Sequence, residues 1–172
     1  MEFKHSSSKK LWGRAALLSA AVIMFSCLSP ASAKADVTQK DMEILAKAIG
    51  FVEGGPSGDV KVDILSGGEA DTVAGILSGG LSSGKVKLIG TKTAASTGAK
   101  VAYIPAGAEG QAAALVSKGI ITVSANPDCA KSGACVIAVT ATPKVEIHVS
   151  KAAAEKAGVS FASAFRMMIT EH

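Results

Sequence analysis

The N-terminal leader limits what the rest of the chain can fold into. A basic start, with lysines at positions 4, 9 and 10 and an arginine at 14, precedes 13 mostly apolar residues from Ala15 to Cys27. Ala31-Ser32-Ala33 then fits the cleavage pattern of a secretory signal peptide. The apolar stretch is shorter than the roughly 20 residues that a membrane-spanning helix needs. We therefore predict a cleaved signal peptide over residues 1–33 and a single domain over residues 34–172, with no membrane span after cleavage.

The charge of the chain comes mostly from this leader. The whole sequence carries 18 Lys and Arg against 14 Asp and Glu, a net charge of +4, whereas residues 34–172 carry 14 against 13. The four aromatic residues beyond the leader are Phe51, Tyr103, Phe161 and Phe165. Domains that bind nucleic acid present a basic patch, often with stacking aromatic side chains. The sequence therefore argues against a nucleic-acid partner.

The cysteines agree with export. Cys27 lies in the leader, so the predicted mature chain keeps one pair, Cys129 and Cys135, and such a pair in a secreted protein normally forms a disulfide. A redox-active pair is the alternative, although its usual spacing is Cys-x-x-Cys, which is absent here. Residues 24–27 faintly resemble the acylation signal of bacterial lipoproteins. Because the bulky Phe25 fits that signal poorly, we do not expect a lipid anchor at Cys27.

Hydrophobic periodicity divides residues 34–172 into short alternating helices and strands. Thr38 and Ser150 are expected to cap helices, and a last helix is expected to begin at Ser160 and to include Phe161, Phe165 and Ile169. The other expected helices cover 69–77 and 109–117, and the expected strands cover 60–65, 85–91, 99–104, 120–124, 135–140 and 144–149. The last two strands are close enough to form an antiparallel hairpin. This order predicts a single α/β domain with a mixed sheet, helices on both faces and a C-terminal β-hairpin.

Two glycine-rich segments invite a functional interpretation. The run Ile-Leu-Ser-Gly-Gly occurs at 64–68 and again at 76–80, which we interpret as two apolar elements that each end in a glycine turn. Residues 79–85 match part of a phosphate-binding loop, but Val86 stands where that motif needs Ser or Thr, and Lys85 is expected to open a strand rather than a helix. We therefore interpret 79–84 as a flexible loop.

No catalytic or metal site can be assembled from the sequence. His148 lies two residues from Glu146 in an expected strand, so the two share a face, and we interpret His148 as an exposed polar side chain. No Asp, Glu, His or Cys cluster has ligand spacing near it, and no serine lies in a nucleophile motif. We therefore predict no enzyme activity, no cofactor and no metal. Met167 and Met168 are either core residues or a docking surface, and we favour the core.

The order of motifs in the last third resembles the YfiR/HmsC family of periplasmic proteins. The segments that carry the resemblance are 119–124, the cysteine pair, 135–139, 144–149 and 152–159. Residues 48–53 are similar to the end of that family's first helix. The chain departs from the family at Gly54-Gly55-Pro56, where members usually have Trp-Pro, and at Val145 and His148, where they usually have Phe and Asn. It also lacks the second, upstream disulfide of many members.

The resemblance implies a function that composition does not. It implies a non-enzymatic periplasmic regulator, typically a homodimer, that contacts the periplasmic part of an inner-membrane diguanylate cyclase. By repressing this partner it limits cyclic-di-GMP and biofilm formation. The alternative is a periplasmic small-molecule-binding protein, with the glycine-rich turns at 66–68 and 79–84 as the rim of its pocket.

Overall fold

The computed structural model describes residues 36–172. The predicted signal peptide and Cys27 lie outside the described residues. The helices are α1 (Gln39–Gly50), α2 (Ala70–Leu77), α3 (Glu109–Val116), α4 (Pro127–Lys131), α5 (Lys151–Ala157) and α6 (Ser163–Arg166). The strands are β1 (Gly58–Leu65), β2 (Leu81–Ser83), β3 (Val86–Thr93), β4 (Val101–Tyr103), β5 (Ile121–Ser124), β6 (Ile137–Thr140), β7 (Glu146–Val149) and β8 (Thr170–Glu171).

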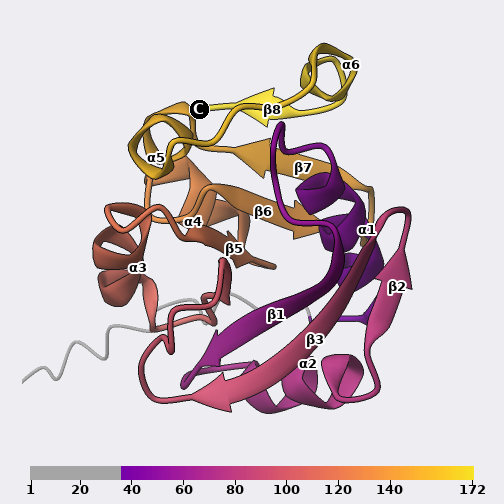
Figure 1. Cartoon of the computed structure of the whole chain (residues 1–172), viewed down its shortest axis with the longest axis vertical. Helices are drawn as coiled ribbons and strands as arrows, with labels where there is room; N and C mark the ends of the chain where they lie inside the picture. Colours follow the sequence, from indigo (N-terminus) through magenta and orange to yellow (C-terminus); the bar gives the residue numbers. More distant parts are fainter. Residues whose placement is uncertain (1–35) are drawn as a thin grey trace, which may run out of the picture. The chain divides into compact units, whose positions relative to one another are not determined.

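The described strands form one mixed sheet in the order β2-β3-β1-β4-β5-β6-β7-β8 (Figure 1). The five strands from β3 to β6 in this order run parallel, whereas β2 is antiparallel to β3 and β7 is antiparallel to β6. From β1 the chain goes outward to β3 and then returns across the sheet to β4. This reversal of direction between β1 and β4 is the mark of a doubly wound α/β sheet.

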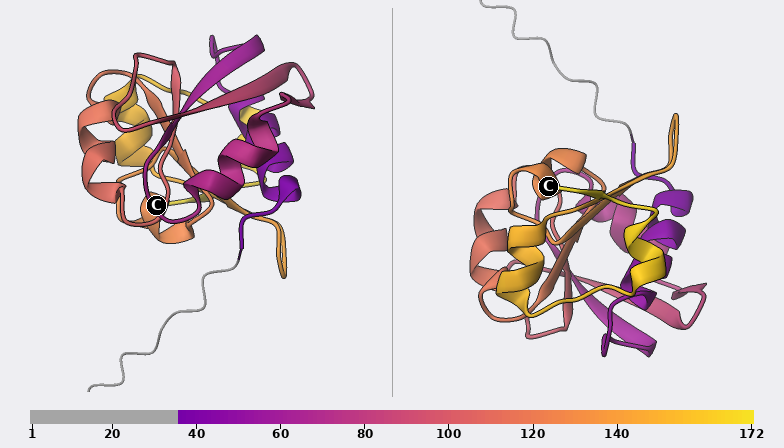
Figure 2. Two further views of the ribbon diagram at one scale, coloured as in Figure 1. Left: turned by 90° about the horizontal axis from the view of Figure 1, so that it is seen from below. Right: turned by 90° about the horizontal axis from the view of Figure 1, so that it is seen from above.

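Helices cover both faces of the sheet, as predicted (Figure 2). On one face, α2 packs against β1 and β3, and α1 contacts β2, β3 and β6. On the other face, α3 packs against β5, α4 packs against β5 and β6, and α5 lies against α3. The alternation along β4 explains the two layers, because Val101 and Tyr103 lie in the larger core whereas Ala102 lies in the smaller core under α3.

Local hydrogen bonds fix the start of α1 and the loop before β4. Thr38 caps α1 as predicted, since its Oγ1 accepts from Asp41 N at 3.3 Å and its N donates to Asp41 Oδ2 at 2.7 Å. The buried Asp63 of β1 accepts from Ser96 Oγ and Thr97 Oγ1, each at 2.8 Å. Burial alone raises the pKa of Asp63, but these bonds, with those from the backbone of Thr97 and Ala99, hold that pKa below its ordinary value.

The hairpin at the C-terminal end of the sheet is confirmed. Strands β6 and β7 pair antiparallel, with Ala138 opposite His148. Ser150 caps α5 as predicted, and Gly158 ends it in the left-handed conformation at φ 66°. The repeated Ile-Leu-Ser-Gly-Gly segments also end two elements, the first β1 and the second α2.

Two interpretations of local structure were wrong. Residues 79–84 are not a flexible loop, because Leu81–Ser83 is strand β2, joined to β3 by a turn at Gly84 with φ 61°. The last helix does not start at Ser160. It is the single turn α6 with Ala162 as its cap, since residue 161 is held in an extended bridge to residue 52.

Candidate protein-contact surface

Three of the four aromatic residues beyond the leader gather between the end of α1 and the segment that leads into α6. The rings of Phe51 and Phe165 stack with their centroids 5.0 Å apart, and Phe161 lies 5.3 Å from Phe165. Phe165 is 1% exposed and belongs to the main core, whereas Phe51 is 38% exposed. The stack therefore joins the core to the surface.

Backbone pairing places these rings together. Helix α1 ends at Gly50, so Phe51 leaves the helix as its C-cap residue. Residues 51–53 then run against residues 160–162: Glu53 N donates to Ser160 O at 2.9 Å, and Ala162 N donates to Phe51 O at 3.1 Å. These bonds link two segments that are more than 100 residues apart in the sequence, which periodicity alone does not reveal.

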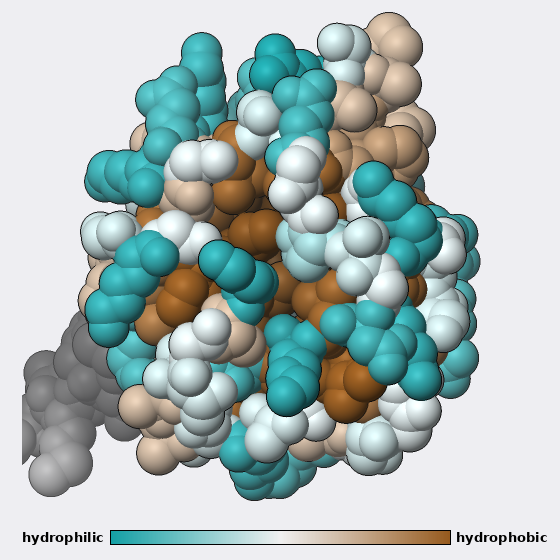
Figure 3. Space-filling model, in the orientation of Figure 1, coloured by the Kyte–Doolittle hydropathy of each residue, from teal (hydrophilic) through white to brown (hydrophobic). Residues whose placement is uncertain are grey.

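Met167 and Met168 are exposed, so the prediction that they are core residues was wrong. Met167 is 85% exposed and Met168 is 57% exposed, directly after α6. The prediction assumed a long helix in which Met168 would share the buried face of Phe161 and Phe165. Because α6 is only one turn, that periodicity stops before the methionines. Figure 3 shows a pale brown, moderately hydrophobic area at the upper right of the view, where α6 lies.

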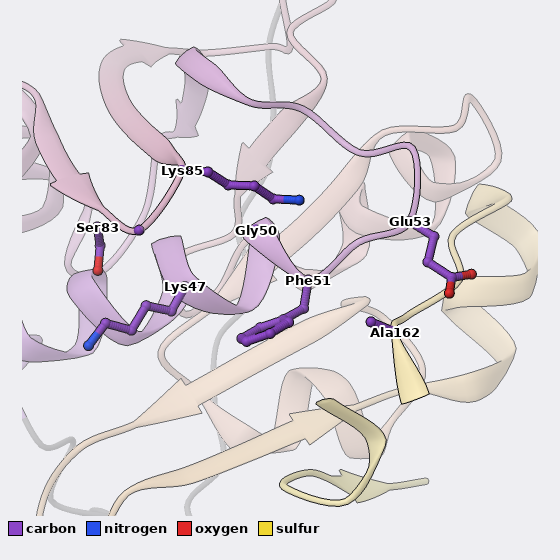
Figure 4. Close-up of a pocket in the computed structure, with 8 residues that line it drawn as sticks. Lys47, Gly50, Phe51, Glu53, Ser83, Lys85 and Ala162 are labelled. Carbon is purple, nitrogen blue, oxygen red and sulfur yellow. The ribbon is translucent and has the colours of Figure 1, made fainter. Parts of the chain in front are cut away.

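A cavity of about 550 Å³ opens beside Phe51 (Figure 4). Residues from the end of α1, the β2–β3 turn and the segment before α6 line it: Lys47, Gly50, Phe51, Glu53, Ser83, Gly84, Lys85 and Ala162. A Cβ at Gly50 would lie 3.6 Å from Lys85 Cγ, an ordinary van der Waals contact, so Gly50 borders the cavity beside the Lys85 side chain. In the figure, Lys47 and Ser83 lie to one side of the Phe51 ring, and Glu53 and Ala162 to the other.

The charges around the cavity are unbalanced. Glu53 accepts a hydrogen bond from Ser160 Oγ at 3.0 Å. Lys47 and Lys85 form no ion pair with any residue in the described part of the chain. The cavity therefore has an apolar floor with two lysines and one carboxylate at its edge. We call Phe51, Met167, Met168 and this cavity the contact surface.

The two glycine-rich turns proposed as a pocket rim lie in different places. Ser83 and Gly84 line the cavity, close to the N-terminal ends of β1 and β3. Residues 66–68 follow the carboxyl end of β1 and pack on the turn after β4, where Gly68 N donates to Ala106 O at 3.1 Å. A Cβ at Gly67 would lie 3.0 Å from Pro105 Cγ, so this turn is tightly closed. The structure therefore does not bring the two turns together.

The carboxyl ends of β1, β4 and β5 are closed by a network of hydrogen bonds. In doubly wound sheets, ligands bind outside these ends at the point where the strand order reverses. Here the side chain of Glu69 occupies that position: its Oε1 accepts from Tyr103 Oη at 2.9 Å, and its Oε2 accepts from Ala106 N at 3.2 Å. Tyr103 Oη also accepts from Ala125 N at 3.3 Å. Burial, and then the charge of Glu69, raises the pKa of Tyr103. We call these four residues the strand-end network.

The predicted disulfide is present in the smaller core. Cys129 of α4 and Cys135, just before β6, are bonded, with their Cα atoms 5.1 Å apart. Both are buried in the smaller core. The bond therefore holds the segment after β5 against the start of β6. No observation tests redox activity, which stays an alternative.

His148 is buried, so its assignment to a solvated face was wrong. It is 7% exposed because β8 adds to the sheet beside β7 and α4 packs on the same strand. Its Nδ1 lies 2.9 Å from His172 Nε2, and its Nε2 lies 3.4 Å from Glu146 Oε2. Within residues 36–172, no group of three or more His, Cys, Asp or Glu side chains is placed to hold a metal ion.

Comparison with known proteins decides the family. A family model described as YfiR/HmsC-like matches residues 41–168. The chain belongs to the YfiR/HmsC-like family. This family is known for periplasmic regulators and is regulatory rather than catalytic. A comparison with curated proteins gives no match.

A solved structure supports the fold. The chain is similar to a conserved domain protein from Vibrio cholerae O1 biovar eltor str. N16961, with a TM-score of 0.51 and 14% sequence identity. The similarity covers 77% of this chain and 59% of that chain, so the shared region is less than two thirds of the solved protein. At this identity the comparison bears on the fold alone. Among the described helices of this chain, none has the length and apolar character to cross a bilayer.

Proposed function

We propose that this protein is a non-enzymatic periplasmic regulator that represses an inner-membrane diguanylate cyclase by protein–protein contact. Through this contact it limits cyclic-di-GMP and biofilm formation. The observation that carries the proposal is the contact surface, in which Phe51 is half exposed and Met167 and Met168, which closely follow its stacking partner Phe165 in the chain, are exposed. Aromatic residues and methionine are enriched at the centres of protein interfaces, and exposed apolar groups rimmed by polar ones mark interaction sites.

The construction of this surface supports protein contact. Phe165 is buried, so it holds the exposed Phe51 ring in place through their stack. The methionines follow α6 and retain their flexible side chains, which suit a surface that adapts to its partner. Lys47 and Lys85 stand at the edge, where charge guides encounter more than it adds affinity.

The cellular test is the level of cyclic-di-GMP after deletion of the gene. We expect the level to rise and to return when the full-length form is re-expressed, but not when a form without residues 1–33 is re-expressed. This result would support both repression and export through the predicted signal peptide. An unchanged level after deletion would contradict repression of a cyclase.

The physical test is capture of the cyclase from inner-membrane extracts of the host. The bait is the exported protein, and the matched variants are Met168→Glu on the contact surface and Lys118→Glu after α3. Both positions are exposed, so neither change should unfold the protein. We expect the wild type and Lys118→Glu to retain the cyclase and Met168→Glu to lose it. Equal capture by all three would contradict the assignment of this surface.

The proposal includes a homodimer, as the family resemblance implies. Light scattering of the purified exported protein should give twice the mass of the mature chain. A monomer at micromolar concentration would leave the cyclase contact standing and would remove the dimer from the proposal.

A second candidate, a periplasmic small-molecule-binding protein, is favoured by the cavity beside Phe51. Its volume of about 550 Å³ falls in the range of sites for small ligands. A thermal-shift screen of metabolites tests it. A compound that raises the melting temperature of the wild type but not of Gly50→Leu, in which a side chain fills the cavity, would support binding there. A screen without any such compound would count against it.

A further inference from the structure

The histidine pair at the end of the sheet has a role that the contact surface does not explain. His148 Nδ1 and His172 Nε2 lie 2.9 Å apart, and the ring planes differ by 26°. The ring centroids are 5.2 Å apart. This distance is about the 2.9 Å between the two nitrogens plus the distance from each nitrogen to the centre of its own ring. The two nitrogens therefore point at each other along the line that joins the rings, as a single shared N–H···N bond requires.

This pair joins the last residues of the chain to β7. We call residues 167–172 the strap. Its backbone is held by few bonds: β8 pairs with β7 over two residues, Lys151 N donates to His172 O at 3.0 Å, and His172 N donates to Val149 O at 3.0 Å. The side chains of residues 170–172 are exposed, and Ile169 is partly buried against the main core. An edge segment held by one partly buried side chain and few backbone bonds opens at lower free energy than the core, so one additional bond affects whether it stays in place.

The number of protons on the pair decides whether that bond exists. One facing nitrogen must carry hydrogen and the other must offer its lone pair. A first added proton can go to the outer nitrogen of His172 and leave the shared bond intact. A second added proton places N–H groups on both facing nitrogens and two positive charges on adjacent rings, so the bond is lost and the rings repel.

The surrounding charges offset only part of this repulsion. Glu146, on β7, is the carboxylate near His148, with Oε2 at 3.4 Å from Nε2, and it can balance one imidazolium. On β8, Glu171 is exposed, and on β6 the residue opposite His148 is Ala138. On α4, which packs against β7, Asp128 and Lys131 pair with each other at 3.2 Å. Among the described residues, Glu146 is the one Asp or Glu that pairs with either imidazole, whereas Lys151 and Glu171, next to His172, pair with neither.

We propose that His148 and His172 form a pH-sensitive switch that holds the strap against β7 and releases it when both imidazoles are protonated. Release leaves the backbone groups on one side of β7 without partners, an edge to which another strand can add. It also frees Met167 and Met168 from their place beside α6. The switch is a property of the fold and does not depend on the proposed function.

The test uses the protein as its host exports it, with NMR as the readout. The imidazole resonances of both histidines and the amide exchange of Lys151 and His172 are followed from pH 7.5 to pH 5, across the range in which histidine titrates. After correction for intrinsic exchange, we expect protection of these two amides to fall by about tenfold or more as the second imidazole titrates. The amides of β4 should stay protected throughout.

The variant His172→Gln separates the switch from a general effect of acid. A glutamine amide can donate to His148 Nδ1 but does not titrate in this range, so the strap of this variant should stay protected at pH 5. The proposal is overturned if this variant loses protection as the wild type does. It is also overturned if the wild-type strap stays protected at pH 5, whether or not both imidazoles have titrated.

Discussion

The strand-end network and the cavity beside Phe51 lie at opposite ends of the parallel strands and are built in opposite ways. At the carboxyl ends of β1, β4 and β5, Tyr103 is fully buried, and its hydroxyl is bonded to Glu69 and Ala125. Near the other end, Phe51 is 38% exposed, and Lys47 and Lys85 form no ion pair within the described residues. The end at which doubly wound folds usually bind ligands is closed by the protein's own side chain, so interaction is expected at the other end.

A substitution in the aromatic stack should have the largest effect on the stability of the molecule. Phe165 stacks on Phe51 and is also a core residue, so Phe165→Ala should lower the free energy of unfolding by about 3–5 kcal/mol. Thermal or urea unfolding measures this. A loss below about 1 kcal/mol would show that the stack contributes little to the core and that the contact surface is independent of it.

The disulfide tests the stability of the smaller core. Cys129→Ser opens one short loop beside α4 and should lower the free energy of unfolding by about 2 kcal/mol. The control is the wild type with its disulfide reduced, which should match the variant. Equal melting of the oxidised wild type and Cys129→Ser would mean that the bond has no stabilising role.

The strand-end network should respond to the loss of a single hydroxyl. Tyr103→Phe keeps the ring but leaves Ala125 N without its acceptor and Glu69 without one donor, which should cost about 1–2 kcal/mol. Capture of the cyclase by the folded variant should be unchanged. A variant that is as stable as the wild type but loses the cyclase would place function at this end and reverse the comparison.

Acid should act on a separate contact, the loop held by Asp63. Because the pKa of Asp63 is lowered in the folded state, this group stabilises the fold above its unfolded pKa of about 3.9, and that contribution is lost as the pH falls through its folded pKa. Asp63→Asn should therefore reduce the loss of stability between pH 5 and pH 2. An unchanged acid profile would show that Asp63 does not supply this dependence.

Much of the fold was predictable because its signals are local. Thr38 and Ser150 cap helices, and the alternation in 144–149 marks a strand, whatever the rest of the chain does. The wrong interpretations have a non-local cause. The expected last helix fails because residues 160–162 pair with residues 51–53, and His148 is buried because β8 adds beside β7.

The contact surface could be predicted only in part. Its aromatic residues were visible in the sequence, as was the possibility that Met167 and Met168 form a docking surface. Nothing in the spacing of positions 51, 161 and 165 shows that they meet. The disulfide was predictable because, once the leader is predicted to be cleaved, each of the two remaining cysteines has one partner available.

The most direct test of the central proposal is cellular cyclic-di-GMP in a deletion strain that expresses one of three forms at equal level: the wild type, Met167→Glu/Met168→Glu, or Tyr103→Phe. The account predicts that the wild type and Tyr103→Phe lower the cyclic-di-GMP level, and that the double methionine variant, although as stable as the wild type, does not. Full repression by the double methionine variant would contradict the assignment of function to the contact surface.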